Sequence, residues 1–254
     1  MLNLNGQVAL ITGSSRGIGR ACALRLAEAG ADVIVNYVTS QAAAQDVAQR
    51  IQRLGRRAAI VKADVTEYED VQTMFEFVRE KFGRLDILVS NAASGGFRPL
   101  MEANARHFEA AMNTNVRALM YLAQAARTLL ERREGRARVI ALSSHGSHLP
   151  LPDYGLIGAS KAALESMVRH LALELGGQGV NCNVVLAGLV ATDATRSLPN
   201  AERIFDGARR KSMVGGRLLT PENVADAVLF LASPLAEMIQ GQTLIIDGGE
   251  ALHP

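Results

Sequence analysis

The sequence predicts an α/β fold, with a single doubly wound domain in which helices cover both faces of a seven-stranded parallel sheet. Short runs of apolar, β-branched residues alternate along the chain with longer helical patterns, an order typical of repeated β–α–β units. The runs are apolar almost throughout, as expected for strands buried on both faces. Right-handed crossovers between parallel strands then give a doubly wound, Rossmann-like sheet.

Each expected strand is a short apolar run that ends at glycine or polar residues. In chain order the strands are VALIT (8–12), DVIVNY (32–37), AAIVKAD (58–64), LDILVSN (85–91), RVIALSS (138–144), NCNVVLAG (181–188) and TLIIDGG (243–249). The helical segments between them include 17–30, 41–54, 68–82, 104–131, 155–176 and 221–232. No repeat, low-complexity tract or Pro/Ser-rich linker interrupts this order, so we expect residues 1–254 to form one domain.

Composition describes an ordinary globular protein with a core of its own. A chain of 254 residues buries about 70–75% of the surface that its unfolded form exposes, so it can fold without disulfide bonds or a structural metal. Hydrophobic residues make up 48% of the chain and charged residues 20%, which is usual for such proteins. The formal charge of +2 argues against a dedicated nucleic-acid binder, for which a basic face is expected.

The N-terminus and the cysteines indicate a cytoplasmic protein. The opening MLNLNGQVALITGSS has no basic leader, and its apolar run soon ends in a glycine turn, so we expect neither a signal peptide nor a membrane span. Cys22 and Cys182 each lie in an apolar stretch without metal-ligand neighbours. They are expected to be buried, reduced thiols, and no metal site is predicted.

A glycine-rich loop follows the first strand, where a doubly wound sheet binds its ligand. The loop TGSSRGIGR carries glycines at 13, 17 and 19, a G-x-x-x-G-x-G spacing. Gly13 allows a tight turn, Gly17 and Gly19 allow close approach of a pyrophosphate, and the next helix points its amides at the anion. Such a loop alone could be only a strand–helix turn, but its place in the first β–α unit favours a dinucleotide.

The next strand ends supply further candidate cofactor contacts. Where an acidic residue would hold the ribose of NAD, the second strand ends in VNYVTS. Without a carboxylate to repel a 2′-phosphate, NADP is favoured. We expect contacts from Asn36, Tyr37, Thr39 and Ser40, from Arg16 in the glycine loop, and from Asp64, Asn91 and Ala92 at the third and fourth strand ends. Each could equally be a polar turn residue.

These motifs resemble those of the short-chain dehydrogenase/reductase family over essentially the whole chain. The matching stretches are TGSSRGIG, NAAS at 91–94, NTN at 113–115, SS at 143–144, ASKAAL and GQTLIIDGG. The resemblance implies a working set of Asn115, Ser144, a tyrosine and Lys161, with nicotinamide held near Thr192. It also implies a homotetramer and a mobile substrate lid at about 190–215.

One departure from the family is informative. The family's usual tyrosine stands four residues before the lysine, where this chain has Ile157, and Tyr154 stands seven before Lys161. That spacing is similar to the enoyl-acyl-carrier-protein reductases, which reduce a carbon–carbon double bond. The stretches NAASGGFRP and EMIQGQTLIIDGG are especially similar to the NADPH-dependent members of that branch.

The two spacings place a tyrosine on the same helix face at different heights. Four residues rotate by about 400° and seven by about 700°, so both return to nearly one face. The shift along the axis is about 4.5 Å. In ketone reduction the carbon that accepts hydride carries the oxygen, whereas in an enoyl thioester hydride goes to Cβ and charge appears on an oxygen three bonds away. The acid must therefore lie farther from the nicotinamide.

The resemblance gives each candidate residue a role. Tyr154 donates a hydrogen bond to the developing enolate oxygen, Lys161 favours the phenolate by its charge and holds the nicotinamide ribose, and Asn115 supports Lys161 directly or through water. Ser144 keeps the family's serine position. The expected cofactor contacts are Gly13, Ser15, Arg16, Gly17, Ile18, Gly19, Asn36, Tyr37, Thr39, Ser40, Asp64, Val65, Asn91, Ala92, Lys161, Gly188, Val190 and Thr192. The substrate expected is an enoyl thioester on acyl carrier protein, reduced by NADPH.

Two alternatives stay open. The protein could be a carbonyl reductase of the same family, such as a 3-oxoacyl reductase, or a catalytically silent dinucleotide-binding sensor. Retention of Asn115, Ser144 and Lys161 argues against the sensor. His145 and His148 could touch substrate but are expected to be ordinary loop histidines. Cations outnumber anions between 193 and 211, which would suit an acidic carrier protein but is equally typical of a solvated helix.

Overall fold

A seven-stranded parallel sheet forms the centre of the protein, as the sequence predicts. The computed structural model describes residues 2–131, 135–196 and 200–252. The strands are β1 (Val8–Ile11), β2 (Asp32–Tyr37), β3 (Ala58–Lys62), β4 (Ile87–Ser90), β5 (Ala137–Ser144), β6 (Val180–Ala187) and β7 (Thr243–Ile246). Their order across the sheet is β3-β2-β1-β4-β5-β6-β7, and every neighbouring pair is parallel.

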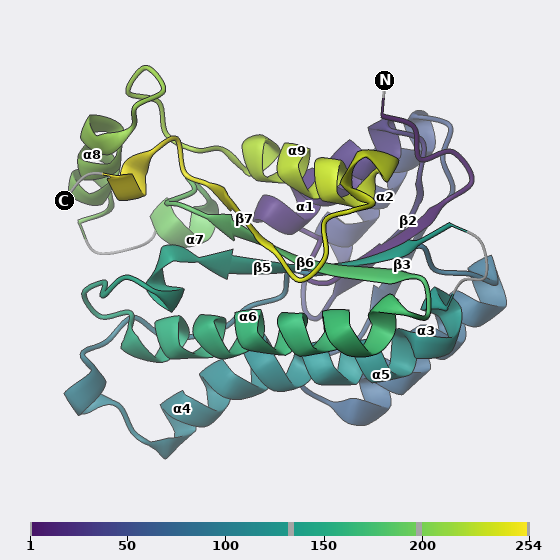
Figure 1. Cartoon of the computed structure of the whole chain (residues 1–254), viewed down its shortest axis with the longest axis horizontal. Helices are drawn as coiled ribbons and strands as arrows, with labels where there is room; N and C mark the ends of the chain where they lie inside the picture. The colour runs from purple at the N-terminus through teal and green to yellow at the C-terminus, as the bar shows by residue number, and fades with distance from the viewer. Residues whose placement is uncertain (1, 132–134, 197–199, 253–254) are drawn as a thin grey trace.

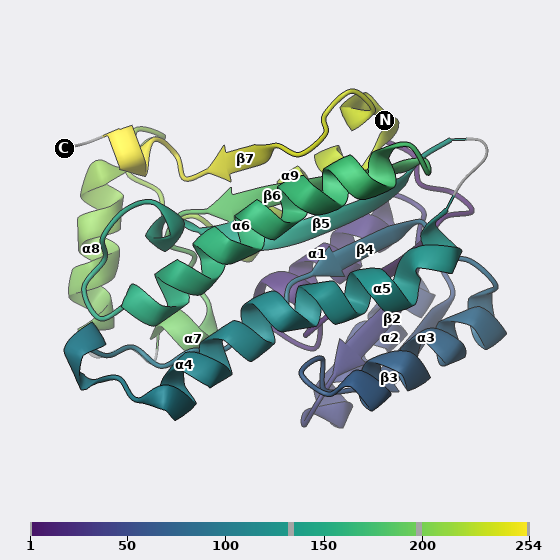
Figure 2. The same ribbon diagram turned by 60° about the horizontal axis from the view of Figure 1, so that its bottom comes forward.

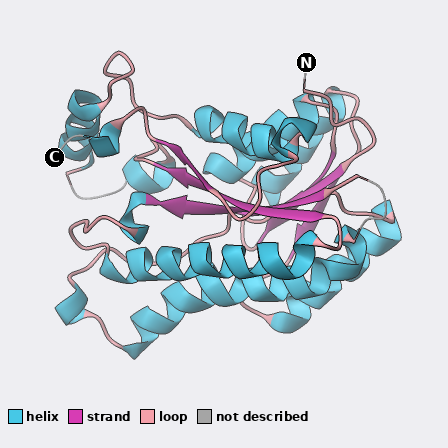
Figure 3. Cartoon of the chain, in the orientation of Figure 1, coloured by secondary structure: helices cyan, strands magenta, loops and turns pink. Residues whose placement is uncertain are grey.

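Helices cover both faces of this sheet (Figures 1 and 3). One layer consists of α1 (Gly17–Glu28), α2 (Gln41–Arg53) and α9 (Pro221–Ala232). The other consists of α3 (Tyr68–Phe82), α5 (Ala118–Leu130) and α6 (Gly155–Gly176), which lie together below the sheet in Figure 1. The remaining helices are the short α4 (Ala105–Met112), α7 (Asp193–Arg196) and α8 (Ala201–Lys211).

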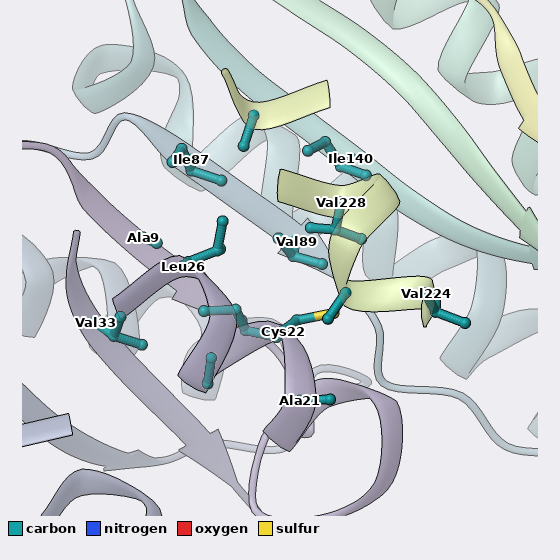
Figure 4. Close-up of a cluster of buried hydrophobic side chains, with 14 of the residues drawn as sticks. Ala9, Ala21, Cys22, Leu26, Val33, Ile87, Val89, Ile140, Val224 and Val228 are labelled. Carbon is teal, nitrogen blue, oxygen red and sulfur yellow. The ribbon is translucent and has the colours of Figure 1, made fainter. Parts of the chain in front are cut away.

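Alternation along the strands divides the core into two clusters. Ala9 and Ile11 of β1 pack with α1 and α9, while Val8 and Leu10 pack with α3 and α5 on the other face. Successive side chains of a strand point to opposite faces, so a strand that is apolar throughout serves both clusters. In the α1–α9 cluster the thiol of Cys22 lies between Val224 and the strands (Figure 4). Cys22 and Cys182 are both buried and free.

The predicted helix over 104–131 is not continuous. Residues Asn113–Arg117 form a π-helical turn between α4 and α5. Such a turn inserts one residue into the helix, often at a functional site, and this one carries Asn115, which is buried.

The order of the strands fixes where a ligand can lie. Strand β1 has β2 on one side and β4 on the other, so the connections diverge at β1 and open a crevice beyond its carboxyl end. Loop residues after β1, β2, β3 and β4 meet there. Of the expected lid at about 190–215, α7, α8 and the residues after them are described, whereas 197–199 lie outside the described residues. No helix in the described part of the chain is both long and apolar enough to cross a membrane.

Candidate active site

A cavity of about 660 Å³ opens at the carboxyl ends of β1 to β4. Most of the expected cofactor contacts line it, and they come from five different loops. They are Gly13, Ser15, Arg16, Gly17, Ile18, Gly19, Tyr37, Thr39, Ser40, Asp64, Val65, Asn91, Ala92 and Thr192.

The glycine loop is held close to the end of β4. Gly13 and Gly17 have positive φ, at 63° and 55°, a conformation that only glycine adopts without cost. A Cβ on Gly19 would lie 2.5 Å from both Asn91 Nδ2 and the Gly13 carbonyl oxygen. Asn91 Nδ2 donates to the Thr12 carbonyl at 2.8 Å, which locks the two loops together. Helix α1 begins at Gly17, and its amide groups therefore face the cavity, as a pyrophosphate requires.

Asn36 has a different role from the one the sequence predicts. Its side chain is buried, and its Oδ1 accepts from the Gly13 amide at 3.0 Å while Nδ2 donates to the Ala63 carbonyl at 3.0 Å. It does not line the cavity. Asn36 holds the glycine loop against the end of β3, and Tyr37, Thr39 and Ser40 supply the cavity wall beyond it.

Tyr154 lies at the start of α6, packed against the turn after β5. A Cβ on Gly146 would lie 2.3 Å from Tyr154 Cδ1, so the ring rests directly on that backbone. The Ser144 side chain lies near its hydroxyl, and the Phe97 ring lies 5.5 Å away between centroids. Burial raises the pKa of Tyr154, and the nearby Ser144 side chain opposes that rise. The structure therefore brings the predicted tyrosine and serine together.

Lys161 is buried beneath this pair. Its Nζ donates to the Leu142 carbonyl at 2.8 Å. Burial lowers the pKa of Lys161 to about 8, and the charge of Glu165, one turn further along α6, opposes that effect. Glu165 in turn accepts a hydrogen bond from the Ser143 hydroxyl. The ammonium is thus bonded directly to β5, while Glu165 supplies the opposite charge from one turn along α6.

Asn115 has no direct hydrogen bond to Lys161 in the described part of the chain, so the expected support through water stays a prediction. Its Oδ1 accepts from the Ser94 amide at 3.1 Å, and its Nδ2 donates to the Ser94 carbonyl at 3.0 Å and to Ser160 Oγ at 2.8 Å. The inserted residue of the π-turn turns this amide inward. Asn115 therefore fixes the loop after β4 to α6, one residue before Lys161.

Three other expected cofactor contacts lie outside the cavity. Lys161 is not among the lining residues, Gly188 N donates to the Ile246 carbonyl at 2.8 Å, and Val190 pairs with Leu219. The cavity also has lining residues that the sequence reasoning missed. They are Val38, Thr66, Glu67, Ala93, Ser94, Ala110, Asn113, Thr114, Arg117 and Asp193. Ala110, Asn113, Thr114 and Arg117 follow a helical spacing, which could have indicated one face turned toward the cofactor.

A glycine loop at the switch point of a doubly wound sheet, with a tyrosine and a buried lysine beside it, defines an NAD(P)-dependent oxidoreductase. Residues 13–250 match the protein-family model described as "Enoyl-(Acyl carrier protein) reductase". The chain belongs to the short-chain dehydrogenase/reductase family.

Similar proteins of this family differ in the reactions that their names describe. The chain is 38% identical to 1-cyclohexenylcarbonyl-CoA reductase of Streptomyces collinus over 96% of this chain and 86% of that protein. It is also 38% identical to hydroxynaphthalene reductase arp2 of Aspergillus fumigatus, over 95% and 91%. A short-chain dehydrogenase of Burkholderia cenocepacia solved in complex with NADP has a TM-score of 0.89 and 36% identity, covering 98% of this chain and 99% of that one.

Proposed function

We propose that the protein is an NADPH-dependent enoyl-thioester reductase, which transfers hydride to the Cβ of a trans-2-enoyl thioester. The observation that carries the proposal is the position of Tyr154. It stands seven residues before Lys161 with the Ser144 side chain near its hydroxyl, while the usual tyrosine place is filled by buried Ile157. The likeness to 1-cyclohexenylcarbonyl-CoA reductase supports an acyl thioester with a conjugated double bond.

The cavity fits NADPH. Its wall beside Arg16 offers Thr39 and Ser40 and no carboxylate at the end of β2, so a 2′-phosphate meets a cation and hydroxyls rather than a repelling charge. The glycine loop leaves room for a pyrophosphate that a side chain at Gly19 would fill. The likeness to a relative in complex with NADP supports the same cofactor. When bound, NADPH supplies the hydride.

The residues of the chain then stabilise charge and set geometry. As hydride reaches Cβ, the double-bond electrons move to the thioester oxygen, and Tyr154 donates a hydrogen bond to that oxygen. Preorganised donors of this kind contribute about 10²–10³-fold to rate. Lys161 keeps positive charge below the tyrosine, and Ser144 holds its hydroxyl in place. Protonation at Cα by a proton from water completes the saturated thioester, so one NADPH and one proton are consumed for each double bond.

A second candidate is reduction of a ketone at the same site. Ser144 near the Tyr154 hydroxyl retains a serine–tyrosine pair, and one relative is named a hydroxynaphthalene reductase. The two reactions differ in where charge appears relative to the hydride-accepting carbon. Comparing the rates with an enoyl thioester and a keto thioester therefore distinguishes them.

The test is NADPH oxidation by the purified protein with crotonyl- and acetoacetyl-thioesters side by side. We expect turnover of the crotonyl substrate and a loss of at least about 100-fold in kcat in Tyr154→Phe. Tyr68→Phe, on the exposed start of α3, is the matched control and retains activity. Turnover of the acetoacetyl substrate alone would replace this proposal by ketone reduction. No turnover with intact NADPH binding would indicate a sensor.

We also propose that the substrate is carried by an acyl carrier protein and that the protein is a homotetramer. Exposed cations of α8 (Arg203, Arg209, Arg210 and Lys211) suit an acidic acyl carrier protein, with α8 acting as part of the substrate lid. A lower KM for the carrier-protein thioester than for the coenzyme A thioester, raised again at high salt, is the expected result. Light scattering checks the homotetramer that we propose from the family likeness.

A further inference from the structure

We propose that His145 is a positioning residue that couples the segment after α8 to Tyr154 through its buried contact with Asp247. The proposal rests on the proposed function only in taking Tyr154 as the acid. It concerns His145 and Asp247, two residues that take no part in the reaction itself.

The contact is a buried bond between two strand ends. His145 Nε2 lies 2.9 Å from Asp247 Oδ2, and the two side chains are 8% and 11% exposed. Asp247 also accepts from the Gly249 amide at 2.8 Å and the Ala251 amide at 2.9 Å. Burial alone would raise the pKa of Asp247, but these bonds and His145 hold it below its ordinary value. The carboxylate is therefore ionised at neutral pH, and the imidazole donates to it.

His145 belongs to the turn that supports Tyr154. It opens the 3₁₀ turn His145–Ser147, directly after Ser144, whose side chain lies near the Tyr154 hydroxyl. Gly146, the next residue, lies under the Tyr154 ring, so closely that a Cβ there would overlap Cδ1 and Cε1. A displacement of this turn moves Ser144 and the backbone under the Tyr154 ring together.

Asp247 belongs to the turn that supports the segment after α8. The Gly248 carbonyl accepts from the Met213 amide at 2.9 Å. A Cβ on Gly249 would lie 2.9 Å from Met213 Sδ, so the methionine side chain packs against this turn. The C-terminal 3₁₀ turn and α8 lie side by side in both orientations (Figures 1 and 2).

The His145–Asp247 contact thus joins two backbone turns. The Tyr154 ring packs on the turn that contains Gly146, and Met213 packs on the turn that contains Gly249. Met213 and Val214 are apolar and 63% and 51% exposed, so their side chains are available to cover an acyl chain bound beside them. Their movement onto the chain would displace the Asp247 turn. Through His145 that displacement reaches the turn under Tyr154, so acyl binding and placement of the acid become linked.

Neither residue of the pair, nor Met213, lines the nucleotide cavity. Loss of the contact should therefore change turnover and the KM for the acyl substrate, and leave the Kd for NADPH unchanged. His148 provides a matched control. Its Nε2 lies 3.4 Å from His145 Nδ1 and its ring packs edge-on at 5.3 Å, but it is exposed and has no bond to Asp247 among the described residues.

The test is a double-mutant cycle between Met213→Ala and His145→Phe, with kcat/KM for whichever thioester the wild type reduces. This choice of substrate keeps the test independent of the enoyl assignment. We expect each single variant to lose about tenfold, and Met213→Ala to lose less than about twofold in the His145→Phe background, because coupled residues give non-additive effects. His145→Gln, whose amide still reaches Asp247, should restore most of the activity, and His148→Phe should be silent.

Independent effects would overturn the proposal. If the losses multiply, if Met213→Ala is silent in the wild type, or if His145→Phe raises the Kd for NADPH as much as the KM for thioester, the pair does not couple the two turns. Should His145→Phe fail to fold, Asp247→Asn replaces it in the cycle, with the same non-additivity expected and the same overturning outcome.

Discussion

Ile157 fills the space directly over Gly95, in the loop after β4. A Cβ on Gly95 would lie 2.4 Å from Ile157 Cγ1 and 3.0 Å from its Cδ1. The place where the family usually carries its tyrosine is therefore closed by a packed aliphatic side chain. A tyrosine ring could enter only by displacing this loop, so the phenol of Tyr154 is the one available to the site.

Replacement of Gly95 by alanine should disturb both stability and catalysis. Gly95 has φ of 151°, and the added methyl would overlap Ile157. Overpacking of this kind costs about 1–3 kcal/mol, so we expect a lower Tm and a reduced kcat as the loop moves off Ile157. Thermal unfolding and steady-state kinetics measure both. Gly177→Ala, where nothing lies within 4 Å of the new methyl, should leave both unchanged, and equal behaviour of the two variants would contradict the prediction.

Glu165→Gln should shift the high-pH limb of the pH–rate profile toward lower pH. Burial lowers the pKa of Lys161 to about 8, and the charge of Glu165 raises it. Without that charge the ammonium loses its proton at a lower pH, and the activity that depends on it falls earlier. The profile of kcat between pH 6 and 10 measures the shift. Glu174→Gln, on the exposed face of the same helix, should leave the high-pH limb of the profile where it lies in the wild type. A profile that Glu165→Gln leaves unchanged would contradict the prediction.

Lys161→Met should stabilise the protein while abolishing turnover. The folded protein holds an ammonium whose pKa is lowered to about 8 from 10.5, so its burial destabilises the fold fully below pH 8. That destabilisation fades as pH rises from 8 to 10.5, because the unfolded chain still binds the proton there. Urea unfolding should give Lys161→Met a higher free energy of unfolding at pH 7 and a smaller advantage at pH 10.

The control for this prediction is Lys62→Met, at the exposed end of β3. It should not show a pH-dependent gain. A Lys161→Met variant less stable than the wild type at pH 7 would mean that the bond from Lys161 to the Leu142 carbonyl outweighs the burial of its charge.

The sequence predicts the parts of this structure that depend on local chemistry. The strands, the glycine loop and the tyrosine–lysine spacing are each encoded by neighbouring residues. The part that Asn36 plays in holding the glycine loop could not be predicted, because its bonds to Gly13 and Ala63 join residues distant along the chain. The π-turn at Asn113–Arg117 was missed because a single inserted residue leaves the helical pattern nearly intact. The same turn reorients Asn115, so its contacts with Ser94 and Ser160 follow from tertiary packing alone.

Thr39→Arg should sharpen the preference for NADPH over NADH. Thr39 and Arg16 line the same cavity, and a second guanidinium there would pair with a 2′-phosphate through charge-assisted hydrogen bonds. Such bonds contribute about 1.5–3 kcal/mol, so the KM for NADPH should fall by tenfold or more while that for NADH stays within about twofold. Gln41→Arg, which adds the same charge on α2 outside the cavity lining, serves as the control for long-range attraction. A Thr39→Arg variant that binds both cofactors more tightly by the same factor would place the 2′-phosphate elsewhere, since only a direct contact distinguishes the two dinucleotides.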